Sequence, residues 1–179
     1  MIYKTMYQSP FGEILLASNG SELVGLWFEK QKYYASCYGS NLIEKNDLEI
    51  FIETKKWLDE YFNKEEPSID RLALNPEGSE FAKEVWQILC EIPYGKVITY
   101  GDIAKEIAKK RNKKTMSAQA VGGAVGHNPI SIIIPCHRVV GTNNSLTGYG
   151  GGLDRKIALL ELEDIDMKQY YRPTKGTAL

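Results

Sequence analysis

The sequence predicts a mixed α/β protein of the α+β kind, with a small N-terminal antiparallel sheet and helix followed by a C-terminal helical domain. Residues 1–30 alternate short aliphatic and aromatic runs with turn-forming residues, which is typical of strands. After residue 47, apolar residues recur at helical spacing instead. A polar stretch at 64–78, with two prolines and a glycine, separates two such blocks and indicates a domain boundary.

The first block predicts three strands, at residues 2–7, 12–18 and 22–28. Turn-forming residues separate them at short intervals, so we expect consecutive strands to pair as an antiparallel meander. Residues 29–46 carry no clear pattern and predict no element.

A helix is expected from Asp47 to Asn63, with Asn46 as its N-cap and an acidic residue three positions later completing a capping box. The polar stretch that follows ends the first block. We therefore place the domains at residues 1–75 and 76–165, and we expect residues 166–179 to form a peripheral tail.

Three helices are expected early in the second block, because Ser79, Thr99 and Ser117 each precede a run with helical periodicity and can cap it. A short extended piece at Lys96–Ile98 lies between the first and second helices. The second and third helices are short and joined by a basic turn, which predicts a helix-turn-helix.

The third of these helices, Ala118–Val125, has almost no side chains. Glycine inside a helix costs about 0.5–1 kcal/mol relative to alanine, so the adjacent Gly122 and Gly123 need a compensating interaction. Either the helix packs tightly on a neighbouring helix, or its backbone closely approaches the groove of a partner. The sequence leaves both interpretations open.

Composition places the chain among ordinary globular proteins: 179 residues, 22 basic and 23 acidic side chains, and 43% hydrophobic residues. No apolar run reaches the roughly 18 residues of a membrane helix, and residues 1–20 show no signal-peptide pattern. Three cysteines without a CxxC pair argue against a disulfide framework and a structural zinc site. We therefore expect a cytoplasmic protein.

Charge is unevenly distributed along the chain. The segment Lys96–Arg138 contains eight basic residues against two acidic ones, whereas the remainder is acidic. This asymmetry indicates a local anionic partner. We expect the basic run between the two short helices to contact phosphates through Lys109, Lys110, Arg111, Lys113 and Lys114.

The apolar run Pro129–Pro135 predicts a buried strand that ends at Cys136. Cysteine reacts as the thiolate and its free pKa is about 8.5, so the adjacent His137 and Arg138 are suited to lowering that pKa. Neighbours on a strand point to opposite faces, so a turn or a water must connect Cys136 to His137.

A third residue should orient the imidazole of His137. The loop Gly148–Gly152 is either a plain connector or a pocket wall, and the helix Leu153–Asp164 closes the domain. The orienting carboxylate is left open among Asp154, Glu161, Glu163 and Asp164.

Residues 134–139 resemble the active-site motif of the O6-alkylguanine-DNA alkyltransferases, also called methylated-DNA–protein-cysteine methyltransferases. The likeness is strong from Gly78 to about Asp164 and loose over the first 75 residues. Further matching motifs are Phe81 with Val85-Trp86, Ile92-Pro93-Tyr94-Gly95, Thr99-Tyr100, Ala120-Val121-Gly122, Asn128-Pro129, Thr147-Gly148-Tyr149 through Leu153, Leu159-Leu160 and Glu163.

This resemblance implies direct-reversal DNA repair by a monomer. The alkyl group of O6-alkylguanine, or of O4-alkylthymine, in double-stranded DNA would pass irreversibly to Cys136, because the thioether product is a poor leaving group. The damaged base would flip out of the duplex, and the second helix of the helix-turn-helix would enter the minor groove. The resemblance implies no metal, no organic cofactor and no membrane.

Residue roles follow by the same resemblance. Glu163 would orient His137, which would take the thiol proton through a water. Tyr100 would protonate guanine N3, and Asn128 would hold the turn before Cys136. An alkyl pocket would be lined by Pro135, Tyr149 and Gly150, and DNA would be contacted by Thr99, Ala118, Gln119, Ala120, Gly122 and Arg138 in addition to the basic run.

Three features depart from the family pattern. Gln119 stands where the family usually has an arginine that enters the base stack, which predicts weaker affinity or slower extrusion. The basic run Lys109–Lys114 is longer than the usual link between these helices. Asp164 stands where the family generally has glycine.

Three other functions compete with alkyl transfer. A non-enzymatic alkyl-lesion-binding protein of the same fold would lack the cysteine. A cysteine hydrolase would have its partner residues distant in sequence. A helix-turn-helix regulator would carry polar side chains on its reading helix, and Ala118–Val125 offers few.

Overall fold

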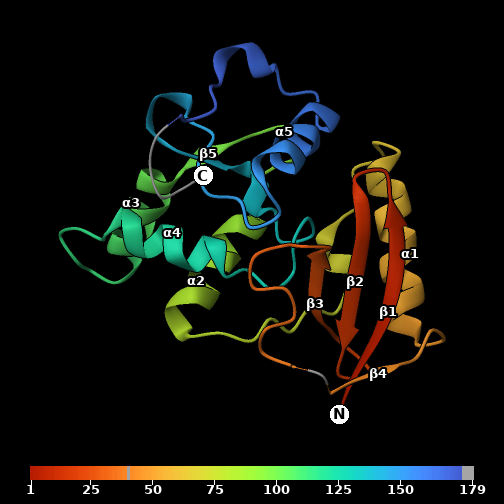
Figure 1. The fold of residues 1–179 in the computed structure, drawn as a ribbon. Coiled ribbons are helices and arrows are strands. Elements are labelled where there is room, and N and C mark those ends of the chain that lie inside the picture. Colours follow the sequence, from red (N-terminus) through yellow and green to blue (C-terminus); the bar gives the residue numbers. More distant parts are fainter. Residues whose placement is uncertain (40, 175–179) are drawn as a thin grey trace. The chain divides into compact units, whose positions relative to one another are not determined.

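The computed structural model describes residues 1–39 and 41–174, which belong to two compact units (Figure 1). The first unit comprises Met1–Glu77 together with Pro129–Ile133. The second comprises Gly78–Asn128 and Ile134–Leu179. Among the described residues, no helix combines the length and the apolar character that a membrane crossing requires.

A four-stranded sheet forms the first unit, in the order β3-β2-β1-β4. β1 (Ile2–Ser9), β2 (Gly12–Ser18) and β3 (Leu23–Phe28) are the three predicted strands, and they pair antiparallel. β4 (Leu42–Glu44) comes from the segment without a clear pattern and pairs parallel to β1. The meander is confirmed, but the fourth strand makes the sheet mixed rather than purely antiparallel.

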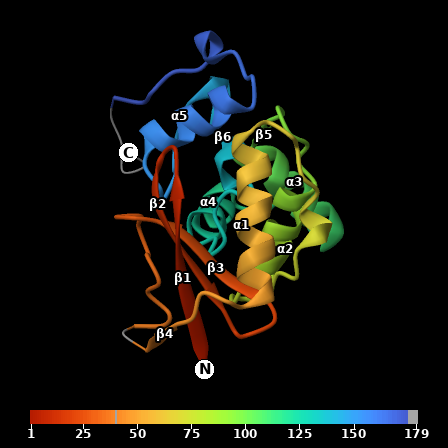
Figure 2. The ribbon, with the colours of Figure 1, turned by 90° about the vertical axis from the view of Figure 1, so that its right-hand side faces the viewer.

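One helix, α1 (Glu49–Phe62), packs on β1 and β2 and buries Phe51 and Leu58 (Figure 2). It begins two residues later than predicted. The side-chain oxygen of Asn46 accepts a hydrogen bond of 2.6 Å from Thr5 Oγ1, and no side chain caps the helix. The predicted capping box is therefore wrong, because a contact with β1 takes the capping oxygen.

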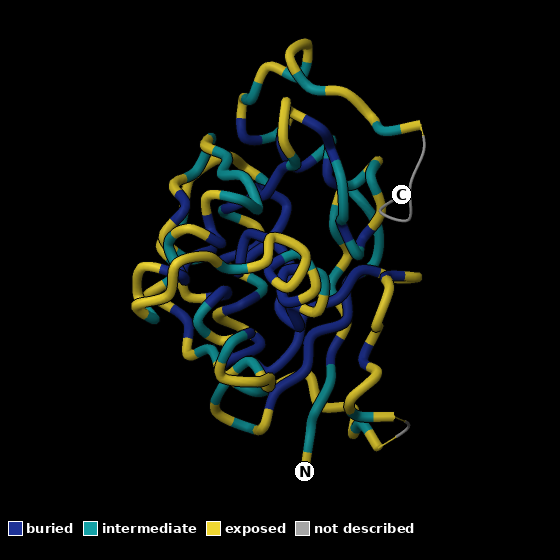
Figure 3. The backbone as a smooth tube through the Cα atoms, turned by 90° about the vertical axis from the view of Figure 1, so that its left-hand side faces the viewer, coloured by how far each residue is buried: buried dark blue, intermediate teal, exposed yellow. Residues whose placement is uncertain are grey.

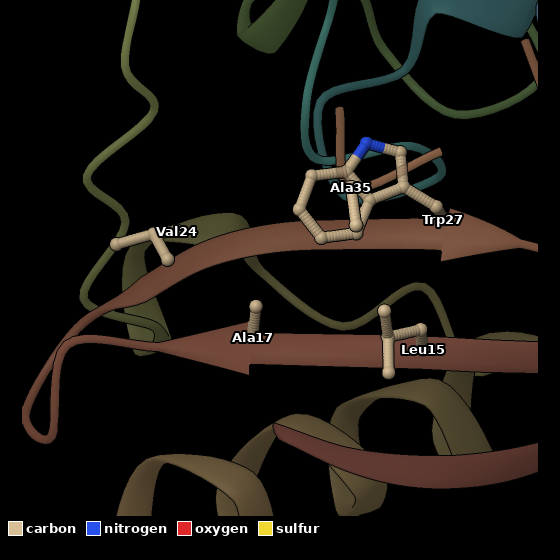
Figure 4. Packing of buried hydrophobic residues seen from close by; sticks show 5 residues of the cluster. All are labelled: Leu15, Ala17, Val24, Trp27 and Ala35. Carbon is tan, nitrogen blue, oxygen red and sulfur yellow. The ribbon is translucent and has the colours of Figure 1, made fainter. Parts of the chain in front are cut away.

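Residues of β2 and β3, together with Ala35, build a hydrophobic cluster at the sheet (Figure 4). Trp27 is its largest member, and the indole lies over Gly25. A Cβ atom at that position would lie 1.8 Å from the ring, so only glycine fits there. The other members shown in Figure 4 are Leu15, Ala17, Val24 and Ala35.

The segment Pro129–Ile133 belongs to the first unit, although the sequence analysis assigned it to the second domain. Ile130 forms a single parallel bridge with Leu26 of β3, and Leu26 hydrogen-bonds the residues on either side of Ile130 at 2.8 and 3.0 Å. Beyond this bridge the predicted strand is wrong, because the chain turns at Ile132, where φ is +68°. β-Branched residues rarely adopt such a φ.

Four α-helices form most of the second unit: α2 (Glu80–Cys90), α3 (Tyr100–Lys110), α4 (Ala118–Gly126) and α5 (Leu153–Leu162). The three predicted N-caps are confirmed. The hydroxyl oxygens of Ser79, Thr99 and Ser117 each accept a hydrogen bond from the backbone N–H three residues later, at 3.1 to 3.2 Å. α3 and α4 pack against each other and against α2, as a helix-turn-helix requires.

A parallel pair of short strands, β5 (Ile98–Thr99) and β6 (Val139–Val140), joins the start of α3 to the chain that follows Cys136. Residues 128–140 are buried without interruption, the longest such run in the described chain; buried backbone is dark blue in Figure 3. The remaining elements are single 3-10 turns: η1 (Ile69–Arg71), η2 (Cys136–Arg138), η3 (Thr142–Asn144) and η4 (Met167–Gln169).

The described residues of the predicted tail, 166–174, are exposed or half-buried, and two of them pack on the second unit. Met167 and Tyr170 pack against a buried cluster of Val140, Leu146 and Leu160. No sequence pattern predicts this packing, because the apolar residues of the tail recur at neither helical nor strand spacing.

Candidate active site

Cys136 opens the 3-10 turn η2 and is 5% exposed. The backbone N–H of Cys136 donates to the carbonyl of Ile134 at 2.8 Å, that of Arg138 to Pro135 at 3.0 Å, and that of Val139 to Cys136. Because the residues are in a turn, the strand rule that would separate the side chains of Cys136 and His137 does not apply. The turn therefore carries the Cys136 thiol and the His137 imidazole on one short segment.

The imidazole of His137 lies 2.6 Å from a carboxylate oxygen of Glu163, measured from Nε2 to Oε1. Both side chains are completely buried. Glu163 is the C-cap residue of α5. Of the four carboxylates that the sequence left open, it is the one that lies beside the imidazole of His137. Asp154, Glu161 and Asp164 are exposed.

Arg138 is buried, which corrects the prediction that it binds DNA. Its Nε and one terminal nitrogen donate to both carboxylate oxygens of Glu163 at 2.9 and 3.0 Å. The other terminal nitrogen donates to the backbone carbonyl of Ile92 at 2.7 Å, and the guanidinium lies 5.7 Å from the centre of the Tyr94 ring. Because its donors are engaged inside the unit, Arg138 fixes the carboxylate that holds His137.

The surroundings shift the pKa values of both His137 and Glu163, and these shifts determine which of the two is charged. Burial lowers the pKa of His137, and Arg138 and Lys156 lower it further, against the opposing effect of Glu163. Burial alone would raise the pKa of Glu163, but contacts with His137 and Arg138 outweigh it and lower this pKa to about 2. At neutral pH the carboxylate is ionised and the imidazole is neutral, so His137 can accept a proton.

Tyr100 begins α3, and its hydroxyl lies within hydrogen-bonding distance of two carbonyl oxygens, of Thr147 at 2.9 Å and of Gly148 at 3.1 Å. Gly148 has a φ of +68°, and a Cβ atom there would lie 2.9 Å from the tyrosine oxygen. Glycine is therefore required at this position. Burial and the nearby Cys136 both raise the pKa of Tyr100, so the phenol keeps its proton.

Lys156 is a site residue that the sequence analysis missed. Its side chain is fully buried, and Nζ donates to the carbonyl oxygens of Val139 at 2.5 Å and Thr147 at 2.9 Å. Burial lowers the pKa of Lys156 to about 8, although Cys136 opposes this shift. A lysine three and four residues before the buried Leu159 and Leu160 lies on the inner face of the helix, and that spacing is the signal that could have identified it.

Asn128 is buried, and its side-chain nitrogen donates to the carbonyl oxygen of Ile134 at 2.8 Å. This bond joins Asn128 to Ile134, the two residues of the second unit that flank the segment Pro129–Ile133. Of the pocket residues, Pro135 and Tyr149 are buried and Gly150 is half-buried. Pro135 directly precedes Cys136 in the chain.

The exposed face of α4 consists of backbone and small side chains. Ala118, Gln119 and Ala120 are exposed, whereas Gly122 faces the Tyr100 ring, from which a Cβ atom would lie 3.9 Å away. The Thr99 hydroxyl accepts from the Asp102 backbone and donates to the Asp102 carboxylate. The small residues of α4 have two interpretations, packing on a neighbouring helix and close approach to a partner's groove. The two are compatible, because one side of α4 packs on α2 and α3 while Ala118, Gln119 and Ala120 are exposed.

The basic run divides into two sets. Lys110 pairs with Glu106 at 3.3 Å, and Arg111 forms a bidentate pair with Glu84 and lies over the Phe81 ring. Among the described residues, no carboxylate pairs with the other three lysines. These three, with Lys105, surround a pocket of about 470 Å³ between α3 and the start of α4, whose floor is formed by alanine and methionine side chains; they are Lys109, Lys113 and Lys114.

No group of three or more histidine, cysteine, aspartate or glutamate side chains that could hold a metal ion occurs within residues 1–39 and 41–174. None of the three cysteines forms a disulfide within the described residues: Cys37 is exposed, Cys90 is half-buried and Cys136 is buried. What the arrangement provides chemically is a buried thiol with a neutral base, an ionised orienting carboxylate and a protonated phenol.

Two family models match the chain. Residues 2–76 match the ribonuclease-like domain of 6-O-methylguanine DNA methyltransferase, and residues 80–165 match the DNA-binding domain of the same family. Together these matches cover almost all of the described chain.

Curated relatives and solved structures agree with the family models. Methylated-DNA–protein-cysteine methyltransferase of Haemophilus influenzae is 43% identical over 92% of this chain and 87% of its own, and that of Methanosarcina acetivorans is 44% identical over 90% and 98%. The crystal structure of Mycobacterium tuberculosis O6-methylguanine methyltransferase has a TM-score of 0.78 at 41% identity and covers 91% of this chain and 93% of its own. A structure of the Mycobacterium tuberculosis protein in complex with DNA has the same TM-score at 40% identity, over 90% and 92%.

Proposed function

This chain belongs to the 6-O-methylguanine DNA methyltransferase family, and from that premise we propose that it repairs DNA by moving the alkyl group of O6-alkylguanine to its own Cys136. O4-alkylthymine is the second substrate we expect. The observation that carries the proposal is the buried series Cys136, His137, Glu163, in which the imidazole lies 2.6 Å from an ionised carboxylate. Such a series supplies a base and its orienting group beside a nucleophile.

The proposed reaction is a single displacement. The thiol proton passes through a water to the neutral imidazole of His137, and Glu163 stabilises the imidazolium that forms. The Cys136 sulfur then attacks the alkyl carbon, so that a carbon–sulfur bond forms as the carbon–O6 bond breaks. Tyr100 supplies a proton to guanine N3, and the base therefore leaves as a neutral molecule. The product thioether is a poor leaving group, so each protein molecule reacts once.

Access to the base requires that it leave the duplex. The open face of α4, with Ala118, Ala120 and the neighbouring Gly122, has the small side chains that a close approach to the minor groove demands. Gln119 projects from this face and would fill the space that the flipped base leaves. Thr99 lies at the start of α3, where its hydroxyl already bonds Asp102, so its DNA contact would come from the backbone.

The cysteines of the chain favour a cytoplasmic location for the reaction. Three cysteines without a disulfide among the described residues, one of them the proposed nucleophile, suit the reducing conditions of the cytoplasm. We place the protein there and expect it to act as a monomer. Pro135, Tyr149 and Gly150 would line the alkyl pocket, and Asn128 would hold the turn before Cys136.

The proposal is tested by incubating the protein with a duplex that carries one O6-methylguanine and measuring the intact mass. We expect one methylene increment per protein molecule, located on the peptide that contains Cys136. Tight binding to the lesion duplex without any mass change would instead identify a non-enzymatic lesion-binding protein. Continued release of product beyond one equivalent would identify a turnover enzyme.

Replacing Gln119 by arginine is expected to tighten binding to the lesion duplex and to speed transfer. Glutamine can hydrogen-bond an unpaired base but supplies no cation, whereas a guanidinium adds one inside an anionic groove. We expect the Kd to fall roughly three- to tenfold, in line with one added charge-assisted contact. Fluorescence anisotropy and single-turnover kinetics measure the two effects, with Gln119→Met as the size-matched control. A variant that neither binds more tightly nor reacts faster would contradict this role of residue 119.

The double variant Lys113→Gln, Lys114→Gln is expected to weaken the salt dependence of DNA binding. Each phosphate contact contributes about 0.9 to the slope of log K against log salt concentration, so the slope should fall by roughly two units. Lys110→Gln is the matched control, because its charge already pairs with Glu106. Anisotropy titrations at several salt concentrations give both slopes. Equal slopes for the double variant and the unsubstituted protein would show that the basic pocket does not contact phosphates.

A further inference from the structure

The C-terminal tail extends beyond the family match, which ends at residue 165, and returns to the loop that precedes the expected pocket wall. The backbone N–H of Leu146 donates to the carbonyl of Tyr171 at 2.9 Å, and the N–H of Tyr171 donates to the carbonyl of Asn144 at 3.2 Å. These bonds flank a parallel bridge between Ser145 and Tyr171. The tail therefore pairs with this loop through one bridge and the two hydrogen bonds beside it.

Side chains reinforce the backbone contact. Tyr170 packs with Met167 against Leu146 of the loop and against Val140, which lies four residues after Cys136. Burial of the ring also raises the pKa of Tyr170. The ion pair of Arg172 with Asp154 lies on the surface, where such pairs contribute little. The tail is thus held by apolar packing and backbone hydrogen bonds.

The loop needs such support. Asn143 and Asn144 have φ values of +56° and +62°, two consecutive non-glycine residues in the left-handed region. Gly148, four residues later, also has a positive φ. Asparagine adopts this conformation more readily than other non-glycine residues, but two such residues in succession persist only where the surroundings hold them. Within the described chain, the tail provides the backbone partners of Asn144 and Leu146.

The same loop presents carbonyl acceptors to two side chains, the half-buried Tyr100 and the fully buried Lys156. The carbonyl of Thr147 accepts from the Tyr100 hydroxyl and from Lys156 Nζ, both at 2.9 Å, and the carbonyl of Gly148 lies 3.1 Å from the same hydroxyl. The charge of Cys136 acts on both Tyr100 and Lys156. A shift of the loop would therefore move the phenol and the ammonium together.

We propose that Tyr170 and Tyr171 are positioning residues for alkyl transfer, because they fix the loop Asn144–Gly148 whose carbonyl oxygens hold Tyr100 and Lys156. The inference rests on the proposed function for its reaction, but the loop geometry on which it depends can be tested without that reaction. Displacements of about 1 Å in a reacting assembly can cost up to 100-fold in rate. The tail contacts neither the nucleophile nor its base, so we expect an intermediate effect of about tenfold.

Two substitutions remove different parts of the contact in the full-length protein. Tyr170→Ala deletes the ring from the cluster. Tyr171→Pro deletes the N–H that bonds Asn144, and the backbone of Tyr170, at φ −107° and ψ 150°, is compatible with a following proline. Tyr170→Phe keeps the ring and should restore the rate, and Gln169→Ala, an exposed residue of η4, is the matched control.

Three measurements on each variant separate positioning from folding and from DNA binding. Single-turnover transfer from an O6-methylguanine duplex and from the free base O6-benzylguanine should both slow about tenfold for Tyr170→Ala and Tyr171→Pro. The Kd for undamaged duplex should stay within twofold. Hydrogen exchange of the peptide spanning residues 142–152 should accelerate at a temperature well below the thermal midpoint of every variant.

The outcomes decide the proposal separately from the function. Unchanged transfer rates together with faster exchange would show that the tail fixes the loop without serving the reaction, and would overturn the proposal. Unchanged exchange would overturn it regardless of activity, because the loop would then not depend on the tail. If the unsubstituted protein transferred no alkyl group, the proposed function would be wrong. Tyr170 and Tyr171 could then have no positioning role in alkyl transfer, whatever the hydrogen exchange showed.

Discussion

Replacement of Cys136 by serine is expected to abolish alkyl transfer while DNA binding is retained. A hydroxyl has a pKa far above that of a thiol, so a neutral imidazole cannot generate the alkoxide that a displacement at carbon would need. Serine is nearly isosteric with cysteine, and the 3-10 turn is held by backbone bonds that the substitution leaves in place. The loss should therefore reach at least the roughly 100-fold that a positioned base contributes.

Intact-protein mass spectrometry after incubation with an O6-methylguanine duplex measures this effect directly. Cys90→Ser is the matched control, because Cys90 is a half-buried thiol of the same unit that has no place in the proposed reaction. It should gain one methylene increment, as the unsubstituted protein does. A methylated product of Cys136→Ser, or a methylated peptide elsewhere in the chain, would mean that Cys136 is not the acceptor.

The second large effect is expected for Glu163→Gln, which should lose both activity and stability. The amide cannot stabilise an imidazolium, so transfer should slow by about 100-fold. It would also leave the buried guanidinium of Arg138 without its carboxylate partner, and breaking a buried pair in this way costs about 3–5 kcal/mol. Glu161→Gln is the matched control: an exposed carboxylate two residues earlier on α5, for which we expect neither effect.

The pH dependence of unfolding gives an independent check on the same residue. The pKa of Glu163 in the folded protein is about 2, below its ordinary 4.5, so its ionised form stabilises the fold above pH 4.5 and this contribution is lost as the pH falls to 2. The difference corresponds to about 3 kcal/mol. The lowered pKa of His137 acts in the same direction, from about pH 6.5 downward. Glu163→Gln should remove the first contribution and keep or enlarge the second, because Glu163 is the group that raises the pKa of His137.

Denaturant unfolding between pH 7 and pH 3 measures both proteins. The stability difference between the unsubstituted protein and Glu163→Gln should shrink as the pH falls through this range. A constant difference would mean that the carboxylate is not preferentially ionised in the fold. In that case the orientation of His137 would have to be attributed to packing rather than to charge.

Local signals explain most of what the sequence could predict. The N-caps at Ser79, Thr99 and Ser117 were identified because capping depends on one side chain and the residues that follow it. The cap at Asn46 failed because a residue of β1, forty-one positions away, takes its oxygen. Long-range competition of this kind has no local pattern, and no single sequence reveals it.

The same distinction applies to the site. Cys136 and His137 could be found because they are adjacent, but their orienting carboxylate was fixed only once α5 brought Glu163 to the imidazole. Arg138 was misassigned because a positive charge in a basic segment suggests an external anion, whereas its partner is that internal carboxylate. Lys156 was overlooked because lysine is almost never fully buried. Its two carbonyl partners lie in the two-residue strand β6 and in a loop, and neither segment is long enough to show a periodic pattern.

The segment Pro129–Ile133 belongs to the first unit, although the residues on either side of it belong to the second, and this prevents a clean cut of the chain into its two units. These residues leave the second unit after Asn128 and re-enter it at Ile134, and they find their partners in the first unit, where Ser131 hydrogen-bonds Gln31 at 3.0 Å. A fragment of residues 78–179 would therefore retain this segment without the strand that it pairs with. In engineering terms, the half that carries the nucleophile is not an exchangeable module. A chimera between two homologues would have to transfer Leu26 and Gln31 together with it.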